Sequence, residues 1–329
     1  MALTFENLIT HNKRASCALI AGQVVLITLL TAVFTASYQT YVYGAPAEDG
    51  LYWGLALGAA LAIAGALVSY YAGSLILLTV SDGYRVEKAD DPRLFNVVEE
   101  MAIAAGIPTP AIYAIPDESP NAMATGRDPR HAAVAITTGL RKKLNRDELQ
   151  AVMAHEIGHI ANYDTRLAML VAVFAGIVVL LSDFLVRTSL DRLGIGGLRG
   201  RPGKRSGFFV SLLSVLVLAV VAAVLAWAAP IIAKLLQLAV SRQREYLADA
   251  TAVKFCRNPE ALAAALRKIA VDPAPLRMEN RATEHLFIVN PDLSKRLDHP
   301  NRDSIWMTHP PVIKRIERIR GLIGRPAGA

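Results

Sequence analysis

The residues most capable of chemistry lie in one stretch in the middle of the chain, Asn145–Asp164. It contains His155, Glu156 and His159, so two histidines stand four positions apart and a glutamate directly follows the first. Positions four apart share one face of a helix, so both imidazoles can reach a single metal ion while the glutamate faces a water molecule beside it. This pattern predicts a zinc site with Glu156 as the general base.

The same stretch carries the signals of a helix that would hold these side chains rigidly. Asn145 can cap the start of the helix, and Glu148 stands three positions later, as in a capping box. Apolar residues then follow at helical spacing: Leu149, Val152, Met153 and Ile160. The predicted metal site therefore stands on a regular element.

A third ligand is needed, because the His-Glu-x-x-His pattern also occurs by chance in unrelated helices. Glu245 and Asp249 lie one helical turn apart within Ser241–Ala250. One carboxylate can bind zinc, and the other can accept a hydrogen bond from a ligating imidazole and fix its tautomer. We expect Glu245 to be the ligand and Asp249 to be the hydrogen-bond partner. The predicted site then binds one Zn²⁺ per chain through two histidines and one glutamate. That set leaves a coordination position open for water, as catalytic sites do. The alternative is a solvated charged helix face.

The composition predicts a membrane protein, because the mean hydropathy is +0.35 and 53% of the residues are hydrophobic. A helix needs about 20 apolar residues to cross a bilayer, and the third of the apolar runs is marginal by that measure. Asp164 and Arg166 would mark the water boundary in front of that third run. The four runs are Ala15–Ala36, Leu51–Val80, Leu167–Leu181 and Phe208–Ala239.

The distribution of charge predicts the orientation. Lys13 and Arg14 precede the first run, which is too long for a signal peptide and is expected to be a retained anchor. The loop Gln39–Gly50 has two acidic residues and no lysine or arginine. The positive-inside rule then places the N-terminus and the chain after Ser81 in the cytoplasm.

The last two apolar runs must form a hairpin, because ligands precede and follow them yet must meet at one ion. The loop at 183–207 is basic, which opposes export, so both a full crossing and a hairpin that enters without spanning stay open. The expected division is a membrane hairpin at 1–80, a first catalytic part at 81–166, a second hairpin at 167–240 and a second catalytic part at 241–329.

The net charge of +7 does not indicate nucleic acid, because the basic excess lies largely in loops beside apolar runs. Anionic headgroups of a lipid bilayer explain that placement, and no nucleic-acid partner is predicted. Cys17 and Cys256 form neither a disulfide framework nor a paired metal motif, and we expect both to be small buried side chains.

Two segments before the catalytic helix are expected to be strands, namely Ala111–Ile115 and His131–Thr138, with Pro116–Arg130 as a loop between them. The second segment is predicted to be a sheet edge that pairs with an extended substrate through main-chain hydrogen bonds. A covered structural strand is the alternative. The residues expected to bind substrate in this way are Ala132, Ala133, Val134 and Ala135.

The ordered motifs resemble the HtpX-like membrane zinc metalloproteases, relatives of the CAAX prenyl proteases within the gluzincins. The motifs are Asn121–Gly126, Ala132–Gly139, Asp147 with Glu148, His155–His159, Asn162, Ser241–Asp249, Thr308–Pro311 and Lys314–Ile316. The resemblance implies an endopeptidase of a bacterial inner membrane that faces the cytoplasm and degrades misfolded or membrane proteins in quality control. The expected fold is mainly α, with about four transmembrane helices and a cytoplasmic α+β protease domain that contains a small β-sheet.

The resemblance also implies roles outside the metal ligands. His309 and Arg315 match positions that contact bound peptide or the transition state, so both are expected to stabilise charge on the attacked carbonyl. Asn121 begins a motif expected to bind substrate. Alternatively, His309 caps the basic helix and Arg315 binds a lipid phosphate.

Two other functions share part of this sequence pattern. An intramembrane-cleaving zinc protease also combines the histidine motif with spans, and Asn290–Asp292 superficially resembles its second motif, although here the surrounding stretch is polar. A non-catalytic scaffold with a vestigial zinc site is the other alternative, but a structural site has no need of Glu156 as a base.

Overall fold

The computed structural model describes residues 5–43, 47–173, 242–272, 287–288 and 310–321. The chain divides into two compact units, the first made of residues 1–16, 71–172 and 237–329 and the second of residues 17–70 and 173–236. Several predicted features lie outside the described residues: the fourth apolar run, most of the third, the basic loop at 183–207, His309 and Asn290–Asp292.

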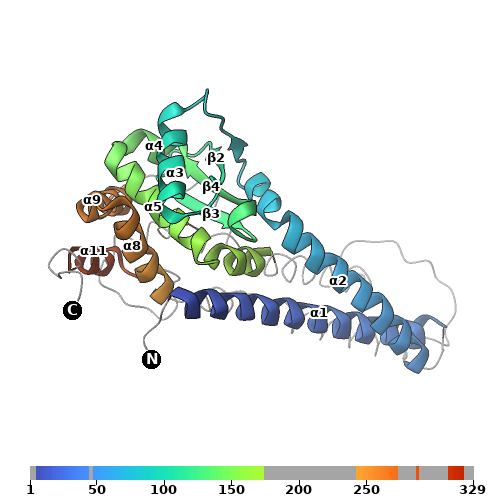
Figure 1. Cartoon of the computed structure of the whole chain (residues 1–329). Coiled ribbons are helices and arrows are strands. Elements are labelled where there is room, and N and C mark those ends of the chain that lie inside the picture. Colours follow the sequence, from blue (N-terminus) through green and yellow to red (C-terminus); the bar gives the residue numbers. More distant parts are fainter. Residues whose placement is uncertain (1–4, 44–46, 174–241, 273–286, 289–309, 322–329) are drawn as a thin grey trace. The chain divides into compact units, whose positions relative to one another are not determined.

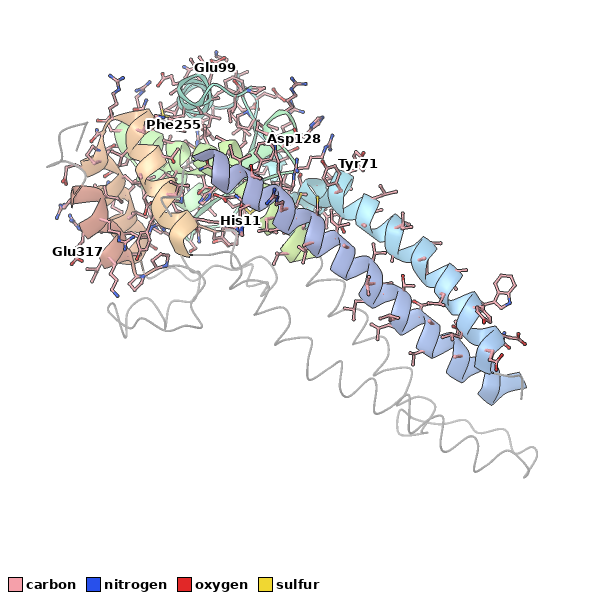
Figure 2. The ribbon with its side chains drawn as sticks, turned by 60° about the horizontal axis from the view of Figure 1, so that its bottom comes forward. His11, Tyr71, Glu99, Asp128, Phe255 and Glu317 are labelled. Atoms are coloured by element: carbon pink, nitrogen blue, oxygen red, sulfur yellow. The ribbon has the colours of Figure 1, made fainter. Side chains whose placement is uncertain are left out.

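Two long helices, α1 (Phe5–Tyr43) and α2 (Ala47–Val80), correspond to the first two predicted spans. They contain apolar stretches at Ile9–Val33 and Glu48–Val80, each long enough to cross a bilayer. Many of their apolar side chains point outward in Figure 2. Within the second unit the two helices touch closely, because a Cβ on Gly54 would lie 2.5 Å from the Cα of Ala32. Small residues at such a contact are typical of helix pairs in membranes.

The first unit contains a four-stranded mixed sheet in the order β1-β2-β4-β3. Strand β4 runs parallel to β2 and antiparallel to β3, with Ala133 opposite Ala111 and Thr125 respectively. The prediction that β4 is the sheet edge is therefore wrong, and so is the prediction of a loop throughout Pro116–Arg130, which contains β3, one of the two edge strands. The strands are β1 (Tyr84–Arg85), β2 (Ala111–Ile115), β3 (Ala122–Gly126) and β4 (Ala132–Thr137).

The strand β3 escapes detection for a physical reason. Its sequence is mostly small residues, which have weak intrinsic preference for strands, and prolines and polar turn residues precede it. Hydrogen-bond pairing with β4 stabilises the strand conformation, which the local sequence of β3 does not favour.

Helices cover the sheet, and the helix with the predicted metal site is α5 (Arg146–Ala161). The predicted capping box is confirmed: the Asn145 side chain accepts a hydrogen bond from the Glu148 amide at 2.9 Å, and the Glu148 carboxylate accepts one from the Asn145 amide at 2.8 Å. Gly106 ends helix α3 (Pro92–Ala105) in the left-handed region, with a φ of 68°.

Helix α5 is the centre of the first unit, because it packs against α3, α8 and α9 as well as strands β3 and β4 (Figure 1). Eleven of its 16 residues are buried, which fits a helix enclosed on several sides. The remaining bounds are α3 (Pro92–Ala105), a short 3-10 turn (Pro129–His131), α4 (Thr138–Lys143), α8 (Arg242–Cys256), α9 (Pro259–Ala270) and α11 (Val312–Gly321).

Candidate active site

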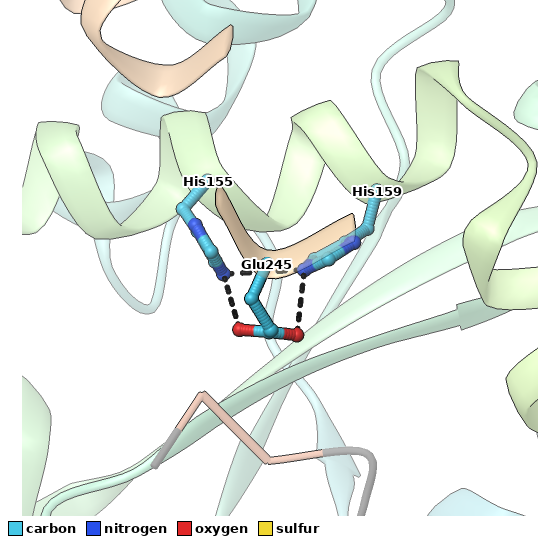
Figure 3. A group of neighbouring side chains, drawn as sticks. All are labelled: His155, His159 and Glu245. Carbon is cyan, nitrogen blue, oxygen red and sulfur yellow. Dashed lines mark hydrogen bonds and ion pairs between the residues drawn. The ribbon is translucent and has the colours of Figure 1, made fainter. Parts of the chain in front are cut away.

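The structure brings the three predicted ligands together (Figure 3). His155 Nε2 and His159 Nε2 lie 3.2 Å apart, and the Glu245 carboxylate oxygens lie 3.7 Å from the first and 3.6 Å from the second. Tetrahedral ligands held about 2.1 Å from a zinc ion are separated from each other by roughly 3.4 Å. The three observed separations lie on both sides of that value, so the donor set fits a zinc ion in both chemistry and size.

Close packing of α5 on α8 makes this meeting possible. Gly158 directly precedes His159 on α5 and faces Thr251 of α8. A Cβ added to Gly158 would lie 3.2 Å from the Cγ2 of Thr251 and 3.7 Å from the carbonyl oxygen of Ala248. A larger residue would push the helices apart and carry Glu245 away from the histidines.

Each ligating histidine has its other ring nitrogen beside a carboxylate. His155 Nδ1 lies 3.1 Å from Asp249 Oδ1, the pairing assigned to Asp249 from sequence. His159 Nδ1 lies 3.0 Å from Asp164 Oδ2. Both contacts favour the tautomer with the proton on Nδ1, which leaves the Nε2 lone pairs free for a metal.

Asp164 lies in the candidate site, and the sequence reasoning did not place it there. It is buried, so the expectation that it marks a water boundary is wrong. Helix α5 ends at Ala161, and a turn through Tyr163 in the left-handed region, with a φ of 61°, carries Asp164 back towards His159. Helical spacing alone gives no sign of this return.

Burial lowers the pKa of His155, although its hydrogen bond with Asp249 acts in the opposite sense, so the neutral ligand form is favoured. Burial also lowers the pKa of His159, but Asp164 and Glu245 outweigh it and raise the value to about 9. Metal binding requires the neutral imidazole and would displace that proton.

Glu156 is buried beside the ligands, and this burial raises its pKa to about 7. Its carboxylate accepts a hydrogen bond from the backbone amide of Ala124 in β3, and Oε1 has no hydrogen-bond partner among the described residues. A buried carboxylate with an open acceptor and a pKa near neutrality has the properties of a general base.

The contact with Ala124 also shows which strand adjoins the site. Strand β3 passes Glu156 and has β4 on one side only. The predicted substrate residues Ala132, Ala133, Val134 and Ala135 belong to β4, which is paired on both sides, so the prediction that they pair with substrate is wrong. Asn121 is buried at the head of β3, where its carbonyl oxygen accepts a hydrogen bond from the Thr137 amide at 2.9 Å.

Part of the outer edge of β3 is already paired by the chain itself. Phe287 forms an antiparallel bridge with Met123, and the Ile288 amide donates to the Ala122 carbonyl at 3.0 Å. An extended segment can therefore add to this edge in the antiparallel sense.

Arg315 comes to the site from α11 and is completely buried. Its Nε and Nη2 donate to the two oxygens of Asp249 at 2.9 and 2.7 Å, and Nη1 donates to the Ile288 carbonyl at 2.7 Å. Nη2 also lies 3.4 Å from His155 Nε2. Burial raises the pKa of Asp249, but the charge of Arg315 outweighs it and lowers the pKa below its usual value. Arg315 thus supports the carboxylate that orients His155.

Comparison with known proteins identifies the family of the chain. A model of peptidase family M48 matches residues 88–323. The "Protease HtpX homolog" of Thermoanaerobacter pseudethanolicus is 44% identical over 229 residues, which cover 70% of this chain and 71% of that protein. The "Protease HtpX homolog" of Dictyoglomus thermophilum is 39% identical over 320 residues, which cover 96% of this chain and 94% of that protein.

A crystal structure of S. mikatae Ste24p aligns with a TM-score of 0.43 and 19% identity over 95% of this chain and 66% of that one. The family match and the identity to the two relatives agree with the resemblance predicted from the motifs. The chain therefore belongs to peptidase family M48, and the predicted class of enzyme, a metalloprotease, is confirmed with it.

Proposed function

We propose that this protein is a zinc-dependent endopeptidase of a bacterial inner membrane that hydrolyses misfolded or membrane proteins at the cytoplasmic face. The observation that carries the proposal is the triangle of His155 Nε2, His159 Nε2 and the Glu245 carboxylate, whose sides of 3.2 to 3.7 Å fit one zinc ion. Relatives named "Protease HtpX homolog" support the choice of a protease over a non-catalytic scaffold.

Glu156 is proposed to move the proton that hydrolysis requires. When bound by the three ligands, zinc supplies a Lewis acid that polarises the scissile carbonyl and lowers the pKa of a water molecule. The Glu156 carboxylate, which has an open acceptor at Oε1, takes the proton and later donates it to the leaving amine.

The outer edge of β3 is proposed to bind the substrate main chain. Ala124 joins this strand to Glu156, and Phe287 and Ile288 already pair beside Met123 and Ala122. Main-chain pairing makes few demands on side chains, which suits an enzyme that cleaves many unfolded sequences. Asn121, at the start of β3, is also proposed to bind substrate.

His309 is proposed to donate a hydrogen bond to the oxyanion, as the resemblance implies. For Arg315 the contacts favour a different role from the predicted direct one. Its nitrogens bond Asp249 and Ile288, and Nη1 also lies 3.4 Å from Glu245 Oε2. We therefore propose that Arg315 positions His155 through Asp249 and adds positive potential beside the metal.

The proposed topology has four transmembrane helices, with hairpins at 1–80 and 167–240 and catalytic parts at 81–166 and 241–329. Helices α1 and α2 supply the first hairpin, and the acidic residues Glu48 and Asp49 in the first turn of α2 suit an external loop.

The metal content and activity of the purified chain test the function. Full-length protein in detergent should hold one zinc per chain and cleave casein, and a chelator should abolish cleavage until zinc is restored. Zinc-free protein that still cleaves casein would contradict the proposal.

A further inference from the structure

A buried asparagine near the start of α1 contacts the carboxylate behind one zinc ligand. Asp164 uses Oδ2 to face His159 Nδ1, and its Oδ1 accepts a hydrogen bond from Asn12 Nδ2 at 2.6 Å. Asn12 is completely buried and belongs, with residues 1–16, to the same compact unit as Asp164. His11, which precedes it, is labelled near the start of α1 in Figure 2.

The side-chain amide of Asn12 also stabilises the turn that leads from Asn162 to Asp164. Asn12 Nδ2 also donates to the carbonyl oxygen of Asn162 at 2.9 Å. Between Asn162 and Asp164 stands Tyr163, whose positive φ of 61° is uncommon for an aromatic residue. Lys13 Nζ lies 4.5 Å from the centre of the Tyr163 ring, so two successive residues of α1 fix this turn.

The chemistry of the contact requires a hydrogen-bond donor at position 12, which the asparagine amide supplies. Both partners of Nδ2 are acceptors, so the NH₂ group and not the carbonyl must face them. An aspartate there would set a second carboxylate against Asp164, and a leucine would leave Asp164 Oδ1 and the Asn162 carbonyl without this donor. Arg244 also lies near Asp164 Oδ1, but its Nε is 3.8 Å away, beyond hydrogen-bond distance.

We propose that Asn12 is a positioning residue of the zinc site, which acts through Asp164 to fix the tautomer and the direction of His159. The inference rests on the proposed zinc-dependent function. It gives the first helix a part in the active site in addition to membrane anchoring, because α1 supplies one of the groups behind a metal ligand.

The test measures zinc affinity by chelator competition on the full-length protein in detergent. Asn12→Leu should bind zinc about 10-fold more weakly, at the lower end of the effect of partners behind metal ligands. Asn12→Asp keeps the size of the side chain but replaces the donor, and it should weaken zinc binding at least as much. Asn258→Ala is the matched control: Asn258 caps α9 by accepting from the Ala261 amide at 3.1 Å, so its loss should lower stability without changing zinc affinity.

A double-mutant cycle with Asp164→Ala separates positioning from general stability. If Asn12 acts through Asp164, Asn12→Leu should add no further loss of zinc affinity in the Asp164→Ala protein. Wild-type zinc affinity in Asn12→Asp, or losses that add in the double variant, would overturn the inference while leaving the protease function intact. Failure of the wild-type chain to bind zinc would instead overturn the proposed function.

Discussion

Replacement of Arg315 by methionine should be among the most destabilising single changes in the catalytic unit. The guanidinium is completely buried and makes two hydrogen bonds to Asp249, at 2.9 and 2.7 Å. Burial alone lowers the pKa of an arginine, but here the charge of Asp249 prevails and raises it above its usual value. Arg315→Met leaves Asp249 as a buried carboxylate without its cation, and breaking a buried pair in this way costs about 3 to 5 kcal/mol.

Arg320 on the same helix provides the matched control. Its side chain is 48% exposed and pairs with Glu260 at 3.2 Å, and an exposed pair of this kind contributes at most about 1 kcal/mol. Denaturant unfolding in detergent, followed by circular dichroism, should give a much lower free energy of unfolding for Arg315→Met than for Arg320→Met. Equal effects would refute the view that the Arg315–Asp249 pair supports the site.

Zinc affinity adds a second readout. A direct oxyanion donor would lower kcat by about 10² to 10³ with zinc binding unchanged, whereas a positioning residue lowers zinc affinity as well.

Three further outcomes are expected. Asp249→Asn should bind zinc about 10 to 100-fold more weakly in chelator competition, and unchanged affinity would remove Asp249 from the site. Burial raises the pKa of Glu156 to about 7, and a base acts only when ionised, so kcat/KM should fall on the acid side of about pH 7. A bound cation shifts this limb to lower pH, and an acid limb that is unchanged in Glu156→Asp would exclude Glu156 as the base. Cysteines introduced for labelling from outside an intact cell should react at Glu48 and not at Arg141, and reaction at Arg141 would reverse the proposed orientation.

The parts of the site that sequence could predict are those governed by local periodicity. The capping box at Asn145, the shared helix face of His155 and His159, and the turn-spaced pair Glu245 and Asp249 all follow from the geometry of a regular helix. Their pairing across α5 and α8 was deduced from zinc chemistry, because one ion needs a third ligand.

The parts that escaped prediction depend on irregular backbone or on long-range packing. Asp164 returns to His159 only because Tyr163 adopts a positive φ, and Asn12 reaches Asp164 across 152 positions of sequence. The edge strand β3 is built from small residues and takes its conformation from pairing with β4, so its propensity resembled that of a loop.

The central claim is that Glu156 supplies the proton transfer at a zinc site made by His155, His159 and Glu245. The most direct test compares zinc content and casein cleavage in the wild-type protein, in Glu156→Gln and in a control, Glu99→Gln, whose side chain is 40% exposed on α3. Glu156→Gln should keep one zinc per chain and lose about 10²-fold or more of kcat, while Glu99→Gln matches wild type in both measurements. Wild-type cleavage by Glu156→Gln with its zinc retained would contradict the account.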